Sequence, residues 1–259
     1  MTNSTQLTEG LMMLHTTRDV HSAEINDVPA IIERLEADGV VLVPGYLDAE
    51  AVAQATSECR ELFERTPSWA HHEDYSVGQS VRMERSDVDP AEFPVVSSAF
   101  ARPELESVVD AFFGEGHIFS RTIYAILDIV GSTTHVQQLH YDKMRHLKSF
   151  VYLTDVGPEN GPFHCLPGSH RVAREQQREN RERRIVPTDE DVRQLPKGMA
   201  GRGIPVLGEA GTLILFDSDI LHHAGIVTEG ERLAIRSLSF GSYRSETWYR
   251  KDGSVEVAP

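Results

Sequence analysis

The stretch Gln137-Gln138-Leu139-His140-Tyr141-Asp142 places a histidine and a carboxylate two residues apart. Side chains alternate between the two faces of an extended strand, so His140 and Asp142 are expected to project from the same face. An imidazole and a carboxylate are two of the three ligands of the facial triad that binds non-haem Fe(II) and leaves the opposite positions open. The stretch therefore predicts part of a metal site on a strand.

The best candidate for the missing second imidazole is His222, far downstream. An apolar run at 211–216 ends in the polar turn Asp217-Ser218-Asp219, and His222 follows it. A ligand from a strand so remote in sequence indicates a closed or two-sheet β architecture. Arg232 then opens another apolar run, as a carboxylate-binding arginine on a neighbouring strand would.

With these residues, the chain resembles the phytanoyl-CoA dioxygenase family of Fe(II)- and 2-oxoglutarate-dependent oxygenases. The resemblance covers about residues 30 to 243 and opens with a strand-like segment at 38–45. A His-x-Asp pair alone is weak evidence, but here it belongs to an ordered set of motifs. The set continues with Leu153-Thr154-Asp155-Val156, Glu159-Asn160-Gly161-Pro162, Pro167-Gly168-Ser169-His170, and Leu221-His222-x-x-Gly225 with Arg232.

The resemblance implies a ligand set and a co-substrate. Fe(II) would be held by His140, Asp142 and His222, and 2-oxoglutarate would chelate it through its keto oxygen and C1 carboxylate. The distal carboxylate would pair with Arg232, whose planar guanidinium can bind it through two hydrogen bonds. We also assign Gln137 to co-substrate binding. O2 would take the last iron position, and the reaction would release succinate and CO2.

The resemblance also indicates which histidine binds the metal and which reaction the protein catalyses. Either His222 or the adjacent His223 could ligate, and the family's His-x-x-Gly spacing selects His222. Related halogenases lack the carboxylate that Asp142 supplies, so hydroxylation is the expected outcome. Ala224 stands where the family often has a hydroxyl residue, so one hydrogen bond to the co-substrate is missing or comes from elsewhere.

Alternatives remain open from the sequence. Epimerisation, desaturation and cyclisation use the same residues as hydroxylation. A cupin-like metalloenzyme without 2-oxoglutarate is a further candidate, as is a non-catalytic jelly-roll binding module. His72-x-Asp74 is a rival metal motif, but no apolar strand surrounds it. His170 is expected to be structural.

The pattern of helices early and strands late predicts a mainly β fold, a jelly roll or double-stranded β-helix with flanking helices. Asp27 and Asp48 are expected to cap two helices that pack on the sheet. We expect one domain over 1–259. It divides into a loose arm at 1–24, a helical flank and loop at 25–115 with the loop at 66–100, a jelly-roll core at 116–243 with a rim insertion at 171–208, and a tail at 244–259.

Six arginines alternate with glutamates in the segment 171–184. The segment could be a basic lid that recruits an anionic substrate. The favoured interpretation is a solvated helix, because Arg178 with Glu182 and Glu179 with Arg183 stand four residues apart.

Composition sets outer limits on function. The 259-residue chain has a net charge of −15, which argues against nucleic acid as a partner, because phosphate backbones are bound by surplus lysine and arginine. No apolar run approaches the length of a membrane span, about 18 residues. Two cysteines and an N-terminus without a secretory pattern predict a cytoplasmic protein. The expected partner is a small-molecule substrate.

Overall fold

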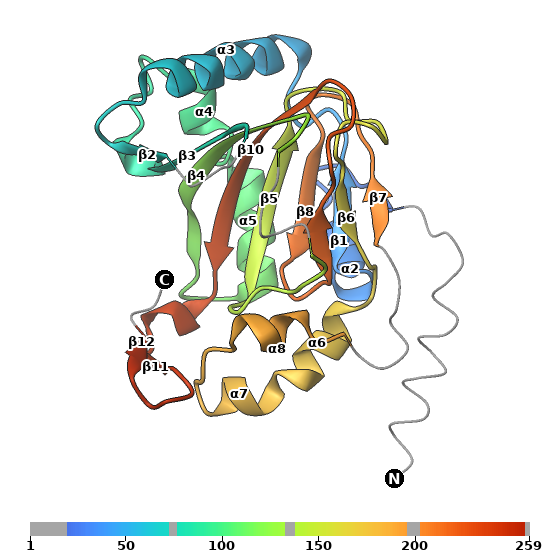
Figure 1. Ribbon diagram of the computed structural model, residues 1–259, viewed down its shortest axis with the longest axis vertical. Coiled ribbons are helices and arrows are strands. Elements are labelled where there is room, and N and C mark those ends of the chain that lie inside the picture. The colour runs from blue at the N-terminus through green and yellow to red at the C-terminus, as the bar shows by residue number, and fades with distance from the viewer. Residues whose placement is uncertain (1–19, 73–76, 133–137, 196–202, 257–259) are drawn as a thin grey trace.

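The computed structural model describes residues 20–72, 77–132, 138–195 and 203–256. Two antiparallel sheets form its centre (Figure 1). The large sheet has the order β1-β8-β5-β10-β4-β3-β2, and the small sheet has the order β7-β6-β9. The large sheet contains Val40–Val43 (β1), Ala70–His72 (β2), Gln79–Glu84 (β3), Ile118–Ile129 (β4), His146–Tyr152 (β5), Leu213–Asp217 (β8) and Glu231–Phe240 (β10). The small sheet contains Phe163–Cys165 (β6), Ile204–Val206 (β7) and His222–Ala224 (β9).

Alternation along the strands separates two apolar layers. On β10, Leu233 and Ile235 belong to the core that also contains the buried side chains of the N-terminal helices, whereas Ala234 faces the small sheet. On β8, Leu215 and Phe216 divide in the same way. The large sheet therefore has helices on one face and the small sheet on the other. The predicted jelly-roll fold is confirmed.

Two helices begin where the sequence predicted aspartate caps. Val28–Ala37 (α2) is capped by Asp27, which accepts a hydrogen bond from Ala30 N, and Ala49–Arg65 (α3) is capped by Asp48. Pro103–Phe113 (α5) ends at Gly114, whose φ of 77° suits glycine. Among the described residues, no helix is both long enough and apolar enough to cross a membrane.

The prediction of a loop at 66–100 was wrong in part. It contains β2, β3, a 3-10 turn at Arg85–Asp87 (η2) and the helix Pro94–Ser98 (α4). The sequence of β3 is largely polar, but it pairs with β4 from Gln79 opposite Leu127 to Glu84 opposite Thr122. A strand near the sheet edge gains its stability from this pairing, so its own apolar pattern is weak.

The rim insertion at 171–208 also differs from expectation. It contains three short helices, His170–Gln176 (α6), Arg178–Glu182 (α7) and Asp189–Arg193 (α8), and then β7, which is a strand of the small sheet. The helices cover one end of the sheets, beside the turn Ser242–Ser245 (η4) and the C-terminal hairpin Trp248–Tyr249 (β11) and Val255–Glu256 (β12) (Figure 1).

Candidate metal and co-substrate site

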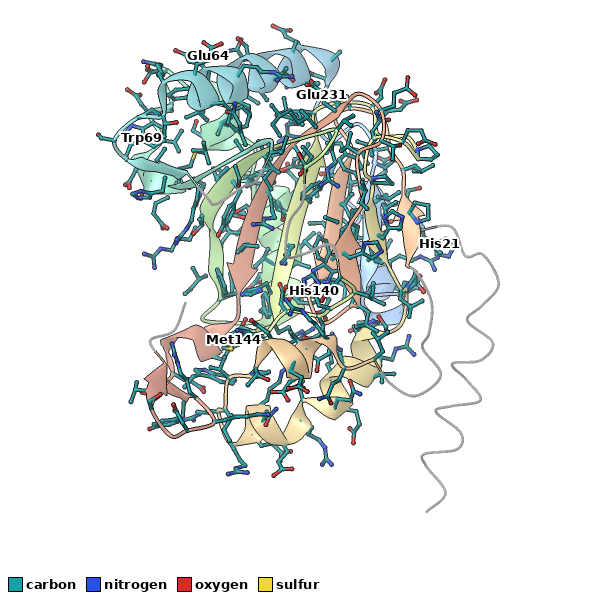
Figure 2. The ribbon with its side chains drawn as sticks, in the orientation of Figure 1. His21, Glu64, Trp69, His140, Met144 and Glu231 are labelled. Carbon is teal, nitrogen blue, oxygen red and sulfur yellow. The ribbon has the colours of Figure 1, made fainter. Side chains whose placement is uncertain are left out.

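His140 and His222 are brought side by side by the pairing of their own backbones. His140 N donates to His222 O at 3.0 Å, and His222 N donates to His140 O at 2.7 Å. This bridge adds the segment around His140 to the edge of the small sheet next to β9. His140 and Met144 lie at the end of the sheet that faces the helices α6 to α8, whereas Glu231, which begins β10, lies near the opposite end (Figure 2).

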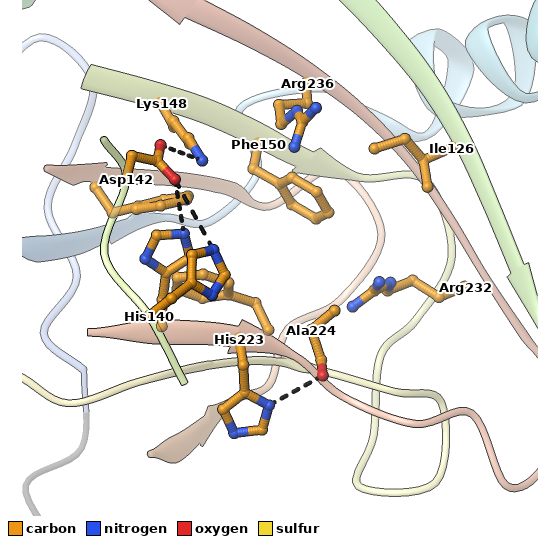
Figure 3. Close-up of a pocket in the computed structure, with 12 residues that line it drawn as sticks. Ile126, His140, Asp142, Lys148, Phe150, His223, Ala224, Arg232 and Arg236 are labelled. Atoms are coloured by element: carbon orange, nitrogen blue, oxygen red, sulfur yellow. Dashed lines mark hydrogen bonds and ion pairs between the residues drawn. The ribbon is translucent and has the colours of Figure 1, made fainter. Parts of the chain in front are cut away.

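Three predicted ligands form one cluster. Asp142 Oδ1 lies 3.9 Å from His140 Nε2 and 3.7 Å from His222 Nε2 (Figure 3). One donor atom from each of the three residues lies within 4.8 Å of the others. The sequence motifs thus identified three side chains that the fold gathers at one point.

Both imidazoles are oriented by backbone carbonyls. His140 Nδ1 lies 2.7 Å from Gln138 O, and His222 Nδ1 lies 2.7 Å from Ile220 O. A carbonyl can only accept, so each Nδ1 carries the proton and each Nε2 presents a lone pair towards Asp142. In this tautomer Nε2 is the nitrogen that can bind a metal.

The choice between the two adjacent histidines follows from strand alternation. His223 points to the other side of β9, where it stacks on His164 with ring centroids 4.6 Å apart. Its Nδ1 lies 3.0 Å from Ala224 O (Figure 3). It is therefore His222 that meets His140 and Asp142.

The outer oxygen of Asp142 is held by two residues of β5 that the sequence reading did not select. Lys148 Nζ lies 2.6 Å from Asp142 Oδ2, and His146 Nδ1 lies 3.2 Å from the same oxygen. Burial raises the pKa of Asp142, but Lys148 and the His146 hydrogen bond outweigh it and keep that pKa well below 3.8. The carboxylate is therefore ionised. Its Oδ2 contacts Lys148 and His146, and its Oδ1 faces the two imidazoles.

Burial also keeps the two imidazoles neutral. It lowers the pKa of His222 well below 6.5, and the neighbouring His140 and Lys148 act in the same direction. Burial likewise lowers the pKa of His140, against the opposing effect of Asp142. Neutral imidazole is the form that binds a metal.

A pocket extends from the three candidate ligands between the two sheets. Its walls include the apolar side chains of Ile126, Phe150, Phe163 and Phe216. Arg232 and Ala224 lie next to each other at its far end (Figure 3). The pocket therefore connects the cluster to the predicted carboxylate-binding arginine.

Arg232 is buried and fixed in place, with a fractional exposure of 4%. Its Nη2 and Nε lie 2.6 and 3.2 Å from Asp128 Oδ2, and Nη1 donates to Gly161 O. The fold thus presents the Arg232 guanidinium to the pocket in one orientation. Asp128 was not selected from the sequence, although it stands opposite Arg232 in the register of β4 and β10.

A second buried network lies behind the cluster. Asp217, the last residue of β8, and Asp219, in the turn that precedes His222, are both fully buried. Arg145 Nη2 lies 2.9 Å from Asp217 Oδ2, Arg181 Nη1 lies 2.8 Å from Asp219 Oδ2, and Arg174 binds Asp217. Burial raises the pKa of Asp217, but Arg145 and Arg174 outweigh it, so that pKa is lowered.

The remaining candidates are not part of the described cluster. Gln137 and Asp74 fall outside the described residues. The backbone of His72 lies in β2, at the outer edge of the large sheet. His170 is fully buried, and its Nε2 lies 3.1 Å from Glu36 O, so it holds α6 against α2 as expected of a structural residue.

Comparisons with known proteins agree with this geometry. The family model described as Phytanoyl-CoA dioxygenase (PhyH) matches residues 35–234. A search of curated proteins found no match.

Several solved structures share the fold. The non-heme alpha ketoglutarate dependent carbocyclase SnoK from nogalamycin biosynthesis is 18% identical, with a TM-score of 0.64 over 85% of this chain and 87% of that one. The corresponding epimerase SnoN is 18% identical, with a TM-score of 0.61 over 83% and 80%. HygX from Streptomyces hygroscopicus, solved with nickel and 2-oxoglutarate bound, is 19% identical, with a TM-score of 0.56 over 83% and 87%.

Proposed function

The chain belongs to the phytanoyl-CoA dioxygenase family, and from this premise we propose that it uses Fe(II), 2-oxoglutarate and O2 to hydroxylate an unactivated C–H bond of a small molecule. One oxygen atom of O2 enters the product and the other enters succinate, which is released with CO2. The observation that supports this proposal best is the gathering of His140, Asp142 and His222 at the end of a pocket that also contains Arg232.

The donor set fits Fe(II). Two neutral imidazole nitrogens and one carboxylate oxygen are the ligands of non-haem iron oxygenases, and their fixed tautomers and ionised carboxylate need no rearrangement of protons. His140, Asp142 and His222 would hold the ion. Bound Fe(II) and 2-oxoglutarate supply the activation of O2 that oxidation of a C–H bond requires.

Arg232 is proposed to bind the distal carboxylate of 2-oxoglutarate. It stands at the opposite end of the pocket from the ligand cluster, and Asp128 and Gly161 O hold its guanidinium in one orientation. The apolar side chains of Phe150 and Phe216 line the pocket between the two ends. The carboxylate would then meet an immobilised donor fork in an environment of low polarity, where a charged hydrogen bond is strong.

The proposal is tested by succinate release. The purified protein would be loaded anaerobically with Fe(II) and 2-oxoglutarate, exposed to O2, and screened with small acids, amino acids, acyl thioesters and secondary metabolites. We expect Fe(II)-dependent succinate formation that one class of compound stimulates. Analysis of the product then separates hydroxylation from epimerisation or cyclisation. Failure to bind both Fe(II) and 2-oxoglutarate would refute the proposal.

Ala224 offers a gain-of-function control. If the distal carboxylate lies between Arg232 and position 224, then Ala224→Ser supplies the hydroxyl group that is common in the family, and it should lower the KM for 2-oxoglutarate. Ala224→Val should raise that KM, because it fills the same space without a donor.

We further propose that residues 1–259 form a single oxygenase domain and that the protein acts in the cytoplasm. The buried, unpaired Cys59 and Cys165 support the cytoplasmic location, because a reducing compartment keeps thiols free.

A further inference from the structure

Arg236 lines the same pocket but has no anionic partner among the described residues. It projects from β10 on the same face as Arg232, opposite Phe150 on β5 and Tyr124 on β4. Its guanidinium carbon lies 4.2 Å from the centroid of the Tyr124 ring. Its Nε is buried without a hydrogen-bond partner. A buried donor left unsatisfied is costly, so this arrangement indicates a site for a ligand.

The other two cations of the pocket are already paired. Lys148 Nζ contacts Asp142 at 2.6 Å, and Arg232 Nη2 contacts Asp128 at 2.6 Å. Each of these pairs is neutral overall. Arg236 differs from both because no carboxylate of the described residues pairs with it.

The charge of Arg236 remains unmatched when the proposed cofactors are added. Fe(II) brings two positive charges, and 2-oxoglutarate brings two negative ones. The ion pairs of Lys148 and Arg232 stay neutral as units. Among the lining residues that the structure describes, Arg236 therefore has the only formal charge without a counterpart. A second anion is therefore needed to complete the site.

We propose that the primary substrate carries an oxyanion, with a carboxylate as the best fit, and that Arg236 binds it. This inference rests on the proposed function for the identity of the co-substrate. The face of Tyr124 supports the guanidinium plane, which leaves the nitrogen atoms at its edge to form two parallel hydrogen bonds with a carboxylate. Arg236 lies between Arg232 and the register position of Lys148, which is opposite Leu238. The substrate anion would thus sit beside the iron end of the co-substrate.

The arginine-rich segment 171–184 is not the anion receptor. Arg174 and Arg181 turn inwards to Asp217 and Asp219, and Arg171 donates to Ala37 O. The other three pair with glutamates: Arg178 with Glu175, Arg183 with Glu179, and Arg184 with Glu246. All six therefore already have acceptors, whereas Arg236 does not.

The test measures anion binding apart from turnover. Wild type and Arg236→Gln would be loaded with Mn(II) and 2-oxoglutarate without O2. Each would then be titrated with benzoate, methanesulfonate and methylphosphonate, with benzamide as the neutral control. We expect wild type to bind benzoate and Arg236→Gln to bind it about 10- to 100-fold more weakly, the effect of losing a charged hydrogen bond. Arg236→Lys should recover only part of the affinity, because it keeps the charge but lacks the fork. The control variant is Arg178→Gln on the exposed face of α7.

The outcomes separate the possible failures. Tighter binding of methylphosphonate or methanesulfonate than of benzoate would support an oxyanion site. It would also show that the substrate anion is a phosphonate or sulfonate and not a carboxylate. Equal binding of benzoate and benzamide would overturn the proposal. So would a large loss of 2-oxoglutarate affinity in Arg236→Gln, because Arg236 would then serve the co-substrate. If wild type binds neither Mn(II) nor 2-oxoglutarate, it is the proposed function that fails.

Discussion

Arg145 and Asp217 form an ion pair that joins the two segments carrying the candidate metal ligands, with Arg145 Nη2 2.9 Å from Asp217 Oδ2. Arg145 follows Asp142 on the way into β5, and Asp217 precedes the turn that leads to His222. The pair therefore fixes the separation of two ligands that are remote in sequence. Arg174 connects the same aspartate to α6.

Asp217→Asn should weaken metal binding even though Asp217 belongs outside the ligand set. Removal of one partner of a buried ion network costs about 3 to 5 kcal/mol of unfolding free energy. Loss of a residue that orients ligands typically reduces metal affinity about 10- to 100-fold. Urea denaturation and equilibrium dialysis with Mn(II) would measure both effects. Glu179→Gln, which breaks the exposed pair with Arg183, should cost less than about 1 kcal/mol. Wild-type Mn(II) affinity in a folded Asp217→Asn variant would show that Asp217 does not position the metal ligands.

Asp142→Ala and His140→Ala should both abolish turnover, but they should differ in stability. Asp142→Ala leaves Lys148, which is 8% exposed, without its counterion. We therefore expect a lower melting temperature for Asp142→Ala than for His140→Ala. The double variant Asp142→Ala/Lys148→Met should recover the melting temperature without recovering activity. Equal melting temperatures of the single and double variants would show that the Lys148 charge is tolerated unpaired.

Arg232→Leu should raise the KM for 2-oxoglutarate by one or more orders of magnitude, given about 1.5 to 3 kcal/mol for a charged hydrogen bond. Because the substitution also leaves Asp128 buried without its partner, Arg232→Leu/Asp128→Asn serves as the variant of matched charge. Both should show the raised KM, and Arg236→Leu should affect that KM much less. The reverse ranking of Arg232→Leu and Arg236→Leu in steady-state kinetics would exchange the two assignments.

Gly225→Ala should impair 2-oxoglutarate binding from outside the pocket. A Cβ at Gly225 would lie 2.4 Å from Pro162 O and 2.8 Å from Gly161 C, so the 161–162 backbone would have to move. Gly161 O is the acceptor that orients Arg232. Overpacking of this kind costs about 1 to 3 kcal/mol. Gly157→Ala is the control, because its Cβ would meet Asn160 Oδ1 only at 3.4 Å. Isothermal titration with 2-oxoglutarate on the Mn(II)-loaded variants would show the difference, and equal affinities would refute it.

The metal-free protein should become less stable as the pH falls below about 6.5. The pKa of His222 is well below 6.5 in the folded state because of burial, so the unfolded state binds more protons between the two pKa values. The free energy of unfolding therefore rises with pH in that interval and decreases on acidification. We expect the melting temperature to fall from about pH 7 to about pH 5, and to fall less in His222→Gln. A pH-independent melting temperature of the wild type would contradict this account.

Part of the structure could be predicted from local sequence, and the rest depends on tertiary contacts. Asp27 and Asp48 cap helices through groups three residues away, so these two helix starts were predictable. The strand expected to carry both His140 and Asp142 was wrong, because His140 makes an isolated bridge to His222 and Asp142 lies outside the strands of the described residues. The pairing of β3 with β4 was not predictable, because β3 has few apolar residues. Lys148 gave no signal either, since a lysine in a strand normally reaches water, whereas here it is buried beside a carboxylate that only the fold brings near.

The arginines of 171–184 also show that local sequence predicts only local contacts. The pairing of Arg183 with Glu179 was confirmed, but Arg178 contacts Glu175 and not Glu182. Arg174 and Arg181 bind aspartates that lie about 40 residues away in sequence, as the separations of 43 and 38 show. Helical spacing predicts neighbours within one helix and contains no information about such remote partners.

The register of β10 has a consequence for regioselectivity. Hydrogen bonding to β4 on one side and β5 on the other fixes Arg236 opposite Phe150, so the anchoring point of a substrate cannot slide relative to the metal. A substrate anchored there by its charged group presents to the iron the carbon that lies at one particular distance along its skeleton. Lengthening the substrate by one methylene should leave oxidation at the same carbon counted from the charged end, and should shift it by one position counted from the far end. The register of the backbone would then set the oxidised position by its distance from the charged group, whatever the total length of the substrate.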